Sequence, residues 1–205
     1  MSFDPPIVIT MPSMNDSHED LPERALALHR RAVVIDSHCD TTQRLLDPHW
    51  DFAARHADWH VDIPRLRDGG VDALVLAVYA PQPAEPDLGV AAARAQLDRI
   101  HETVRRCRDS LTLARSADDV RRAKRDGRIA VLIGIEGGYL IADSIDVLRE
   151  FHKRGAVYMT LTHAFHTTWA DSSGVHEALA PLHGGLTELG PEVDREKNRL
   201  GMMVD

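Results

Sequence analysis

The chain has 205 residues, of which 43% are hydrophobic and 27% charged, and its formal net charge is −8. This length and composition suit one globular domain with a sizeable core and argue against intrinsic disorder. The acidic balance argues against nonspecific nucleic-acid binding, which needs clustered excess lysine and arginine, and no run approaches the roughly 20 apolar residues of a membrane helix.

The N-terminal segment and the cysteines give further expectations. Residues 1–20 lack a basic start followed by an apolar stretch, so we expect no secretory signal and a cytoplasmic protein. Their scattered prolines and polar residues predict a mobile arm, which leaves 21–205 as the folded domain. The chain has 2 cysteines, which is no disulfide framework.

The first strong motif follows a short predicted helix over 23–31. Val33–Ile35 is a β-branched run, typical of a strand buried on both faces in a parallel sheet. The run leads to His38 and Asp40, which are two residues apart and therefore point to the same side of a strand. Imidazole and carboxylate at the carboxyl end of a parallel strand suit zinc or a similar divalent ion, although a hydrogen-bonded strand end is the plain alternative. Cys39 faces the other way and is expected to be a buried packing residue.

An irregular polar section over 41–59 separates this motif from a short helix that is expected to start near Pro64 and to end on two glycines. Three histidines in this part are weaker ligand candidates, because no spacing ties them to a strand end and an exposed histidine is usually only solvated. They are His49, His56 and His60.

Strands and amphipathic helices then alternate, the pattern of a parallel sheet covered by helices. The expected strands span 73–79, 129–135 and 157–162, and the expected helices span 90–108, 116–126 and 144–154, the last two capped by Ser116 and Ser144.

Two further ionisable residues come directly after predicted strands. Glu136 follows the strand over 129–135 and precedes two glycines that permit a sharp turn; it can ligate one metal or bridge two, or else support the start of the next helix. His163 follows the strand over 157–162. Because parallel strands bring their carboxyl ends to one rim, we expect these side chains to meet His38 and Asp40 there.

The last part of the chain predicts a polar rim loop over 164–185, which contains His166, His176 and His183. A final helix is expected to be capped by Thr187 and to end at Gly201, with a further strand opening after it. This repeat is typical of half a barrel.

Several motifs together resemble the membrane (renal) dipeptidase family of zinc peptidases, in family order over about residues 32–205. They are Ile35-Asp36-Ser37-His38-Cys39-Asp40, Asp62-Ile63-Pro64-Arg65-Leu66-Arg67-Asp68-Gly69-Gly70, Gly134-Ile135-Glu136-Gly137-Gly138, Leu161-Thr162-His163, Thr168-Trp169-Ala170-Asp171-Ser172 and Gly185-Leu186-Thr187.

The resemblance implies an α/β fold, a (β/α)8 barrel of the TIM type, of which this chain would be the N-terminal half: about the first four βα units and the start of strand 5. It implies hydrolysis of the peptide bond of a dipeptide by water activated at two zinc ions. His38 and Asp40 would be ligands of the first zinc, Glu136 would bridge both, and His163 would be the catalytic histidine that contacts the substrate at its reacting carbonyl.

The resemblance also implies that this chain lacks some parts of the site. The histidines of the second zinc site would lie beyond residue 205, which leaves that site incomplete. In the last helix, Asp194 and Lys197 stand where similar proteins usually have apolar residues, so its packing face is expected to be weak.

Two alternatives and one open question accompany the dipeptidase prediction. The open edge of the last strand favours a catalytically inactive fragment or interaction module that needs a partner half. Another barrel-type metal-dependent amidohydrolase is the weaker alternative, because those enzymes commonly open with His-x-His, whereas this chain has His38 and Asp40. The sequence leaves open whether the protein is a homo-oligomer.

Overall fold

The computed structural model describes residues 21–81, 85–174 and 179–205, so the mobile arm predicted over 1–20 lies outside the described residues. Contacts divide the chain into two compact units, with the boundary between Ala32 and Val33. In the first unit, helix α1 spans Leu21–Arg31 and has no buried side chain among its own residues. Glu23 in its first turn and basic residues in its last turn favour this helix through its dipole.

The second unit, Val33–Asp205, alternates strands and helices. Its elements are β1 (Ile35–Cys39), α2 (Thr42–Leu45), α3 (Ile63–Asp68), β2 (Ala73–Val78), α4 (Pro86–Arg106), β3 (Leu111–Leu113), α5 (Ala117–Arg125), β4 (Ile129–Ile135), η2 (Gly138–Ile141), α6 (Ile145–Lys153), β5 (Ala156–Met159), α7 (Leu189–Leu200) and β6 (Met203–Val204).

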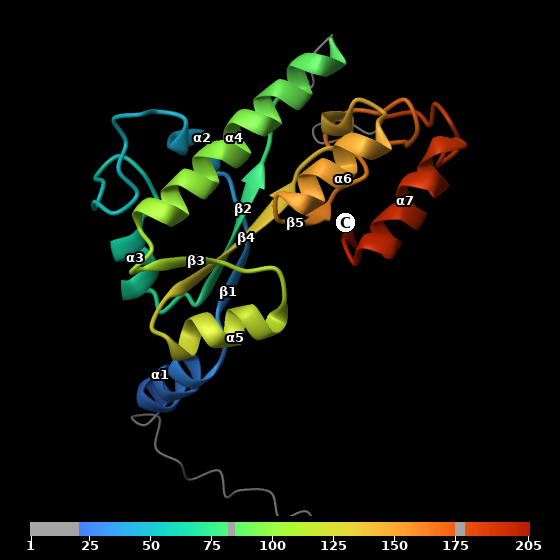
Figure 1. Cartoon of the computed structure of the whole chain (residues 1–205). Helices are drawn as coiled ribbons and strands as arrows, with labels where there is room; N and C mark the ends of the chain where they lie inside the picture. Colours follow the sequence, from blue (N-terminus) through green and yellow to red (C-terminus); the bar gives the residue numbers. More distant parts are fainter. Residues whose placement is uncertain (1–20, 82–84, 175–178) are drawn as a thin grey trace, which may run out of the picture. The chain divides into compact units, whose positions relative to one another are not determined.

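The strands of this unit form one parallel sheet, which confirms the predicted α/β class. The strand order is β1-β2-β4-β5-β6, and β3 pairs with the start of β4. Because all strands run the same way, the carboxyl ends of β1, β2, β4 and β5 lie at one rim of the sheet (Figure 1). β4 and β2 are in continuous register from Ala130 to Ile135, so these two strands end level with each other.

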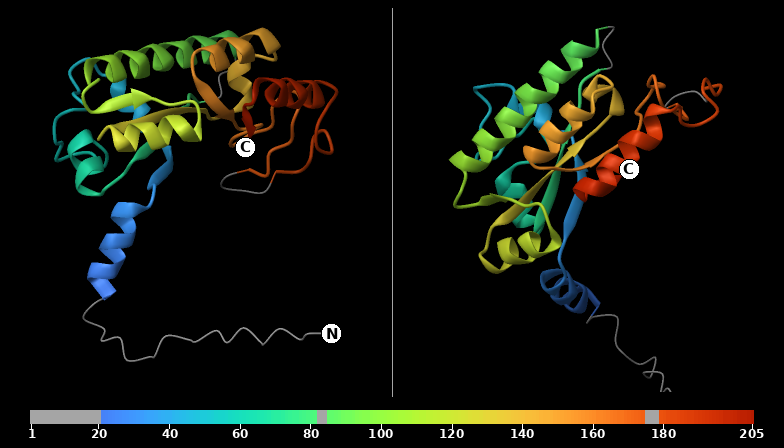
Figure 2. Two further views of the ribbon diagram at one scale, coloured as in Figure 1. Left: turned by 60° about the horizontal axis from the view of Figure 1, so that its bottom comes forward. Right: turned by 45° about the vertical axis from the view of Figure 1, so that its right-hand side comes forward.

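The main core lies between the sheet and α4. In both views of Figure 2, α4 runs along the sheet. Its side chains Val90, Leu97 and Ile100 are buried in one cluster with Leu74 and Val131 of the sheet. Because side chains alternate along a strand, the neighbouring Ala73 and Ala130 face the other way. These alanines form a smaller cluster with residues of α5. The sheet is thereby fixed from both sides.

Side-chain caps set the starts of three helices, and the sequence predicts two of these caps, Ser116 and Ser144. Asp62 accepts a hydrogen bond from Arg65 N at α3, Ser116 from Asp119 N at α5, and Ser144 from Val147 N at α6. These bonds satisfy amide groups that have no partner inside their helices.

The predicted cap of the last helix is wrong. α7 begins at Leu189, and its N-cap position is Glu188, whose side chain makes no capping bond. Thr187 is instead hydrogen-bonded to the rim loop through its own N–H, which donates to Trp169 O. The predicted end is confirmed: Gly201 follows α7 with a φ of 72°, a conformation that glycine adopts without strain.

The burial predicted for the first strand is also wrong. β1 pairs only with β2 among the described strands and lies at an edge of the sheet. Ile35 is therefore 52% exposed and Val33 42% exposed, although both are β-branched residues of the kind found in buried strands. Cys39 is buried, as its predicted packing role requires, and its Sγ lies 3.2 Å from Thr41 Oγ1.

β5 ends at Met159, three residues earlier than the predicted bound. The side chain of Thr160 turns toward the neighbouring strand end, where its Oγ1 accepts a hydrogen bond from Gly137 N. The short strand β3 and the short helix α2 were not predicted, because elements of this length show no period. None of the described helices is long and apolar enough to cross a membrane.

Lys197 on α7, which was expected to weaken the packing of this helix, lies inside the core. Lys197 is fully buried, and its Nζ donates a hydrogen bond to the Met159 carbonyl at the end of β5. Burial lowers the pKa of Lys197 to about 8, although the negative charges of Asp194 and Asp205 act in the opposite direction. The lysine stem thus packs like an apolar side chain, at the cost of burying its amine.

Candidate metal centre

The first two candidate ligands lie where β1 ends. His38 is on the strand and Asp40 follows its last residue, so the two side chains project toward the same side. The distance between His38 Nε2 and Asp40 Oδ1 is 3.6 Å. Both side chains are partly open to solvent, with 41% of the His38 and 61% of the Asp40 side chain exposed.

Glu136 joins this pair from the end of β4. Its Oε2 lies 3.3 Å from His38 Nε2, and its side chain is only 14% exposed. Burial raises the pKa of Glu136 above its ordinary value; His38 and His163 act to lower it, and Asp40 adds to the rise. The Glu136 amide donates to Val78 O, which extends the β2–β4 pairing to the candidate ligand itself.

The Glu136 turn is tightly packed. Gly137 has a φ of 115°, which favours glycine, and its amide donates to Thr160 Oγ1. Gly138 needs space instead: an added Cβ would lie 2.3 Å from Leu161 O and 2.5 Å from the buried Trp169 ring. The two glycines thus hold Glu136 against the segment that carries His163.

His163 approaches Glu136 from the side of β5. Its Nε2 lies 3.2 Å from Glu136 Oε1, and its ring centroid is 5.0 Å from that of Tyr79. Because β5 ends at Met159, a loop rather than a strand positions this histidine. The loop is fixed by Ser172, whose hydroxyl donates to the His163 carbonyl over 2.6 Å.

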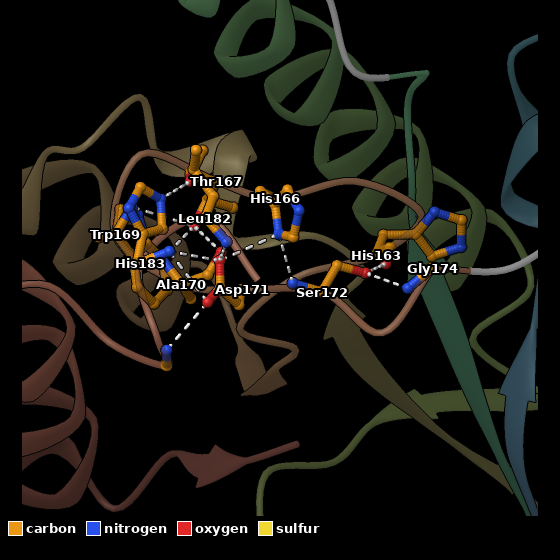
Figure 3. Close-up of polar contacts among 11 residues, drawn as sticks. His163, His166, Thr167, Trp169, Ala170, Asp171, Ser172, Gly174, Leu182 and His183 are labelled. Carbon is orange, nitrogen blue, oxygen red and sulfur yellow. Dashed lines mark hydrogen bonds and ion pairs between the residues drawn. The ribbon is translucent and has the colours of Figure 1, made fainter. Parts of the chain in front are cut away.

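The rim loop is organised around Asp171 (Figure 3). Its carboxylate accepts hydrogen bonds from the amides of Leu182, His183 and Gly185. Burial acts to raise the pKa of Asp171, but these backbone donors outweigh it and lower the pKa to about 2. His166 Nδ1 is 3.2 Å from the same carboxylate and accepts from Ser172 N. The Asp171 network therefore supports the loop that carries His163.

The other histidines considered in the sequence do not join the cluster. His56 Nε2 lies 2.7 Å from Asp51 O and its ring stacks on Trp50, while His49 and His60 are exposed. The ring of His183 is used in the rim loop, with Nε2 2.9 Å from Thr167 O. His176 lies outside the described residues.

The donor set of His38, Asp40 and Glu136 fits a divalent metal. It is the only group of at least three histidine, cysteine or acidic residues, within the part of the chain that the structure describes, whose ligand atoms all lie within 4.8 Å of one another. Tetrahedral ligands at about 2.0–2.1 Å from zinc stand roughly 3.3–3.5 Å apart. The 3.3 Å separation between His38 Nε2 and Glu136 Oε2 falls in that range, and the 3.6 Å separation between His38 Nε2 and Asp40 Oδ1 lies slightly above it.

A hollow of about 380 Å³ opens beside the cluster and is lined by Asp40, Gln43, Tyr79, Glu136 and His163. Gln43 and Tyr79 were not predicted as site residues. Hydrogen bonds to the Tyr79 backbone fix both residues. The side-chain amide of the buried Gln96 on α4 accepts a hydrogen bond from Tyr79 N and donates one to Tyr79 O. Gln43 Nε2 donates a second hydrogen bond to Tyr79 O. The available signal was that Tyr79 directly follows β2, as Glu136 follows β4.

Comparisons with known proteins find relatives of this chain in sequence and in fold. Dipeptidase verJ of Clonostachys rogersoniana is 40% identical over 156 residues, which are 71% of this chain and 39% of that protein. The probable dipeptidase PvdM of Pseudomonas aeruginosa has a similar fold, with a TM-score of 0.78, 20% identity and coverage of 92% of this chain and 50% of that chain. The fold of a metallopeptidase from Rhodobacter sphaeroides, solved with a phosphinate mimic of the dipeptide L-Ala-D-Ala, matches with a TM-score of 0.72, 24% identity and coverage of 84% and 57%.

These matches confirm the predicted barrel class: the curled parallel sheet corresponds to part of a TIM-type barrel. The chain spans about two fifths of the length of the curated relative that it matches. The model of the membrane dipeptidase family, peptidase family M19, matches residues 22–205, and this family of metallopeptidases implies the use of a metal. With 184 of its 205 residues inside that match, the chain belongs to the membrane dipeptidase family.

Proposed function

We propose that this chain carries the zinc-binding part of a dipeptidase that hydrolyses the peptide bond of dipeptides. The observation that carries the proposal is the convergence of His38, Asp40 and Glu136 at one rim, with His163 Nε2 3.2 Å from the other oxygen of Glu136. The family match supports the dipeptidase class over other barrel-type amidohydrolases.

Each residue has a role that fits its position. His38 and Asp40 would hold one zinc ion together with Glu136 Oε2, while Glu136 Oε1, on the His163 side, would be available to a second. Zinc supplies a Lewis acid that polarises a peptide carbonyl and makes water a nucleophile near neutral pH. His163 would donate a hydrogen bond to the substrate carbonyl oxygen as negative charge develops on it.

The hollow beside the cluster supports a small substrate. Its volume of about 380 Å³ lies at the lower end of the range of about 300–1,000 Å³ for small-molecule sites. The mimic in the Rhodobacter sphaeroides relative makes L-Ala-D-Ala the first dipeptide to test. The chain spans 39% of the curated relative, and Glu136 is its one predicted ligand for a second zinc ion, so turnover of a dipeptide by this chain is a separate proposal from its metal centre.

The first experiment measures zinc. The 205-residue protein is dialysed against Zn²⁺ and the bound metal is quantified, for the wild type, for Glu136→Gln and for Asp118→Asn. Asp118 is the matched control, since its side chain is 88% exposed on α5. We expect stoichiometric zinc in the wild type and the control and a large loss in Glu136→Gln. A wild-type protein that retains no zinc would contradict the metal centre.

The second experiment measures hydrolysis. Release of free alanine from L-Ala-D-Ala is followed with and without a chelator, and Glu136→Gln serves as the inactive reference. We expect chelator-sensitive release that Glu136→Gln lacks. Zinc binding without hydrolysis would refute turnover by this chain while leaving its metal centre in place.

An interaction module that needs a partner half is the second candidate. The strands at the two ends of the sheet expose apolar side chains: Ile35 on β1 is 52% exposed, Met203 on β6 58% and Val204 45%. Exposed apolar strands at a sheet edge are surfaces on which another strand can pair. Light scattering distinguishes the candidates, because an active monomer excludes the need for a partner half.

A further inference from the structure

The two ring nitrogens of His38 have different surroundings. Nε2 lies 3.3 Å from Glu136 Oε2 and 3.6 Å from Asp40 Oδ1, on the side of the candidate metal centre. Nδ1 lies 3.3 Å from the hydroxyl oxygen of Tyr158. A neutral imidazole has one N–H and one lone pair, so the partner at Nδ1 influences which nitrogen offers its lone pair to the cluster.

Tyr158 reaches His38 because the neighbouring strand leaves room for its ring. It is a buried residue of β5, and Gly134 of β4 is its partner in the sheet register. A Cβ at Gly134 would lie 2.1 Å from Tyr158 Cζ and 2.4 Å from its hydroxyl oxygen, so the ring lies across the glycine. On β2 the residue level with Gly134 is Ala77, which is also small.

This arrangement connects strands that are not neighbours. β5 and β1 are separated by β4 and β2 in the sheet order, which can be followed in Figure 1. The hydroxyl of Tyr158 nevertheless comes within hydrogen-bonding distance of β1, across a path kept free by a glycine and an alanine. A tyrosine that only filled space would gain nothing from placing its hydroxyl on this nitrogen.

We propose that Tyr158 is a positioning residue of the metal centre: its hydroxyl would accept the hydrogen bond of His38 Nδ1–H and so leave the Nε2 lone pair to the metal that His38, Asp40 and Glu136 would hold. The inference rests on the proposed metal-binding function and adds a residue to it. Histidine ligands usually give their second N–H to an acceptor, and loss of that acceptor typically weakens metal binding by about 10–100-fold. Gly134 on β4 leaves the space in which the Tyr158 ring lies, and so allows this acceptor to reach His38.

The variant Tyr158→Phe tests the inference, because it removes only the hydroxyl and keeps the ring over Gly134. Two quantities are measured on the 205-residue chain: Zn²⁺ affinity by calorimetry with a competing chelator, and the ¹H and ¹⁵N chemical shifts of the His38 ring N–H in the zinc-loaded protein. His38→Ala assigns the His38 signals. Circular dichroism checks that Tyr158→Phe is folded.

We expect the zinc-loaded wild type to show a His38 Nδ1–H proton signal shifted downfield by its hydrogen bond, and Tyr158→Phe to lose that shift and to bind Zn²⁺ about tenfold or more weakly. Equal Zn²⁺ affinity of the two proteins, or an unchanged His38 Nδ1–H signal in Tyr158→Phe, would overturn the role of Tyr158. A wild type that binds no Zn²⁺ would refute the metal centre instead, so the two failures are distinguishable. If Tyr158→Phe does not fold, the absence of a hydrogen-bonded Nδ1–H signal in the zinc-loaded wild type would overturn the role.

Discussion

The buried amine of Lys197 makes a quantitative prediction about stability. The side chain is fully buried in α7, and burial lowers its pKa from 10.5 to about 8. At neutral pH the amine is protonated in the folded and in the unfolded chain, so folding must bury the charge. Between about pH 8 and pH 10.5 the unfolded chain binds more protons than the folded one, and the free energy of unfolding therefore rises with pH.

The magnitude follows from the same two pKa values. From about pH 7 to about pH 10, Lys197 should contribute about 2.5 kcal/mol of added stability to the wild type. Lys197→Met keeps the volume and removes the titration. The variant loses the hydrogen bond from Lys197 Nζ to the Met159 carbonyl. That carbonyl still accepts a hydrogen bond from the amide of Asp205, over 3.3 Å. We expect the variant to be more stable than the wild type at pH 7 and to lose that advantage by about pH 10.

The assay is urea unfolding followed by circular dichroism at several pH values. Thiols also titrate in this range, so the quantity to compare at each pH is the difference in free energy of unfolding between the variant and the wild type. Lys153→Met is the matched control, because Lys153 is exposed at the end of the neighbouring helix α6 and its removal should leave that difference independent of pH. Parallel curves for Lys197→Met and wild type between pH 7 and pH 10 would refute the argument that Lys197 is buried as a charge.

Three further changes test the packing beside Glu136, the hydrogen bonds of the rim loop and the cap of α5. Gly138→Ala should lower the free energy of unfolding by about 1–3 kcal/mol, because its Cβ would overlap Leu161 O and the Trp169 ring. Gly127→Ala is the control: the space around Gly127 is open, so this change should cost only about 1 kcal/mol of backbone strain. Urea unfolding measures both costs. Asp171→Ala should increase hydrogen exchange of the rim-loop amides that its carboxylate accepts from, and unchanged exchange would contradict its organising role. In the wild type that protection should persist as the pH falls below 4 and disappear only near pH 2, because the pKa of Asp171 is lowered to about 2. Ser116→Ala should cost about 1 kcal/mol by removing the cap of α5, and no change in the urea midpoint would show that the cap is dispensable.

The strand ends were the part of the site that sequence could predict. Parallel strands bring their carboxyl ends to one rim, so residues that directly follow β-branched runs are expected to meet there. His38, Asp40 and Glu136 do meet at this rim, with ligand atoms within 4.8 Å of one another. Their role as metal ligands stays a prediction, because proximity alone does not show that an ion is bound.

The sequence predicts His163 as a site residue, but it does not reveal the contacts that hold the site together. His163 lies in a loop held by Ser172, and Tyr79, which was not predicted, is fixed by the amide of the buried Gln96 on α4. Neither contact has a local period or a spacing that a sequence pattern detects. The edge position of β1 was missed for a related reason: Val33 and Ile35 look like buried strand residues, and only the pairing of the sheet shows that they are exposed.

The glycines beside Glu136 show how one sequence feature can serve different physical needs. The pair was interpreted as a source of backbone freedom, but only Gly137 uses a positive φ. Gly138 is required by close packing against Trp169, and Gly134, two residues before the candidate ligand, is required by the ring of Tyr158. On β4 and in the turn that follows it, a missing side chain therefore permits a positive φ at Gly137 and admits an aromatic ring at Gly134 and Gly138. Because those two rings come from the rim loop and from β5, substitution of Gly134 or Gly138 should disturb the candidate metal centre through its neighbours while leaving every ligand in place.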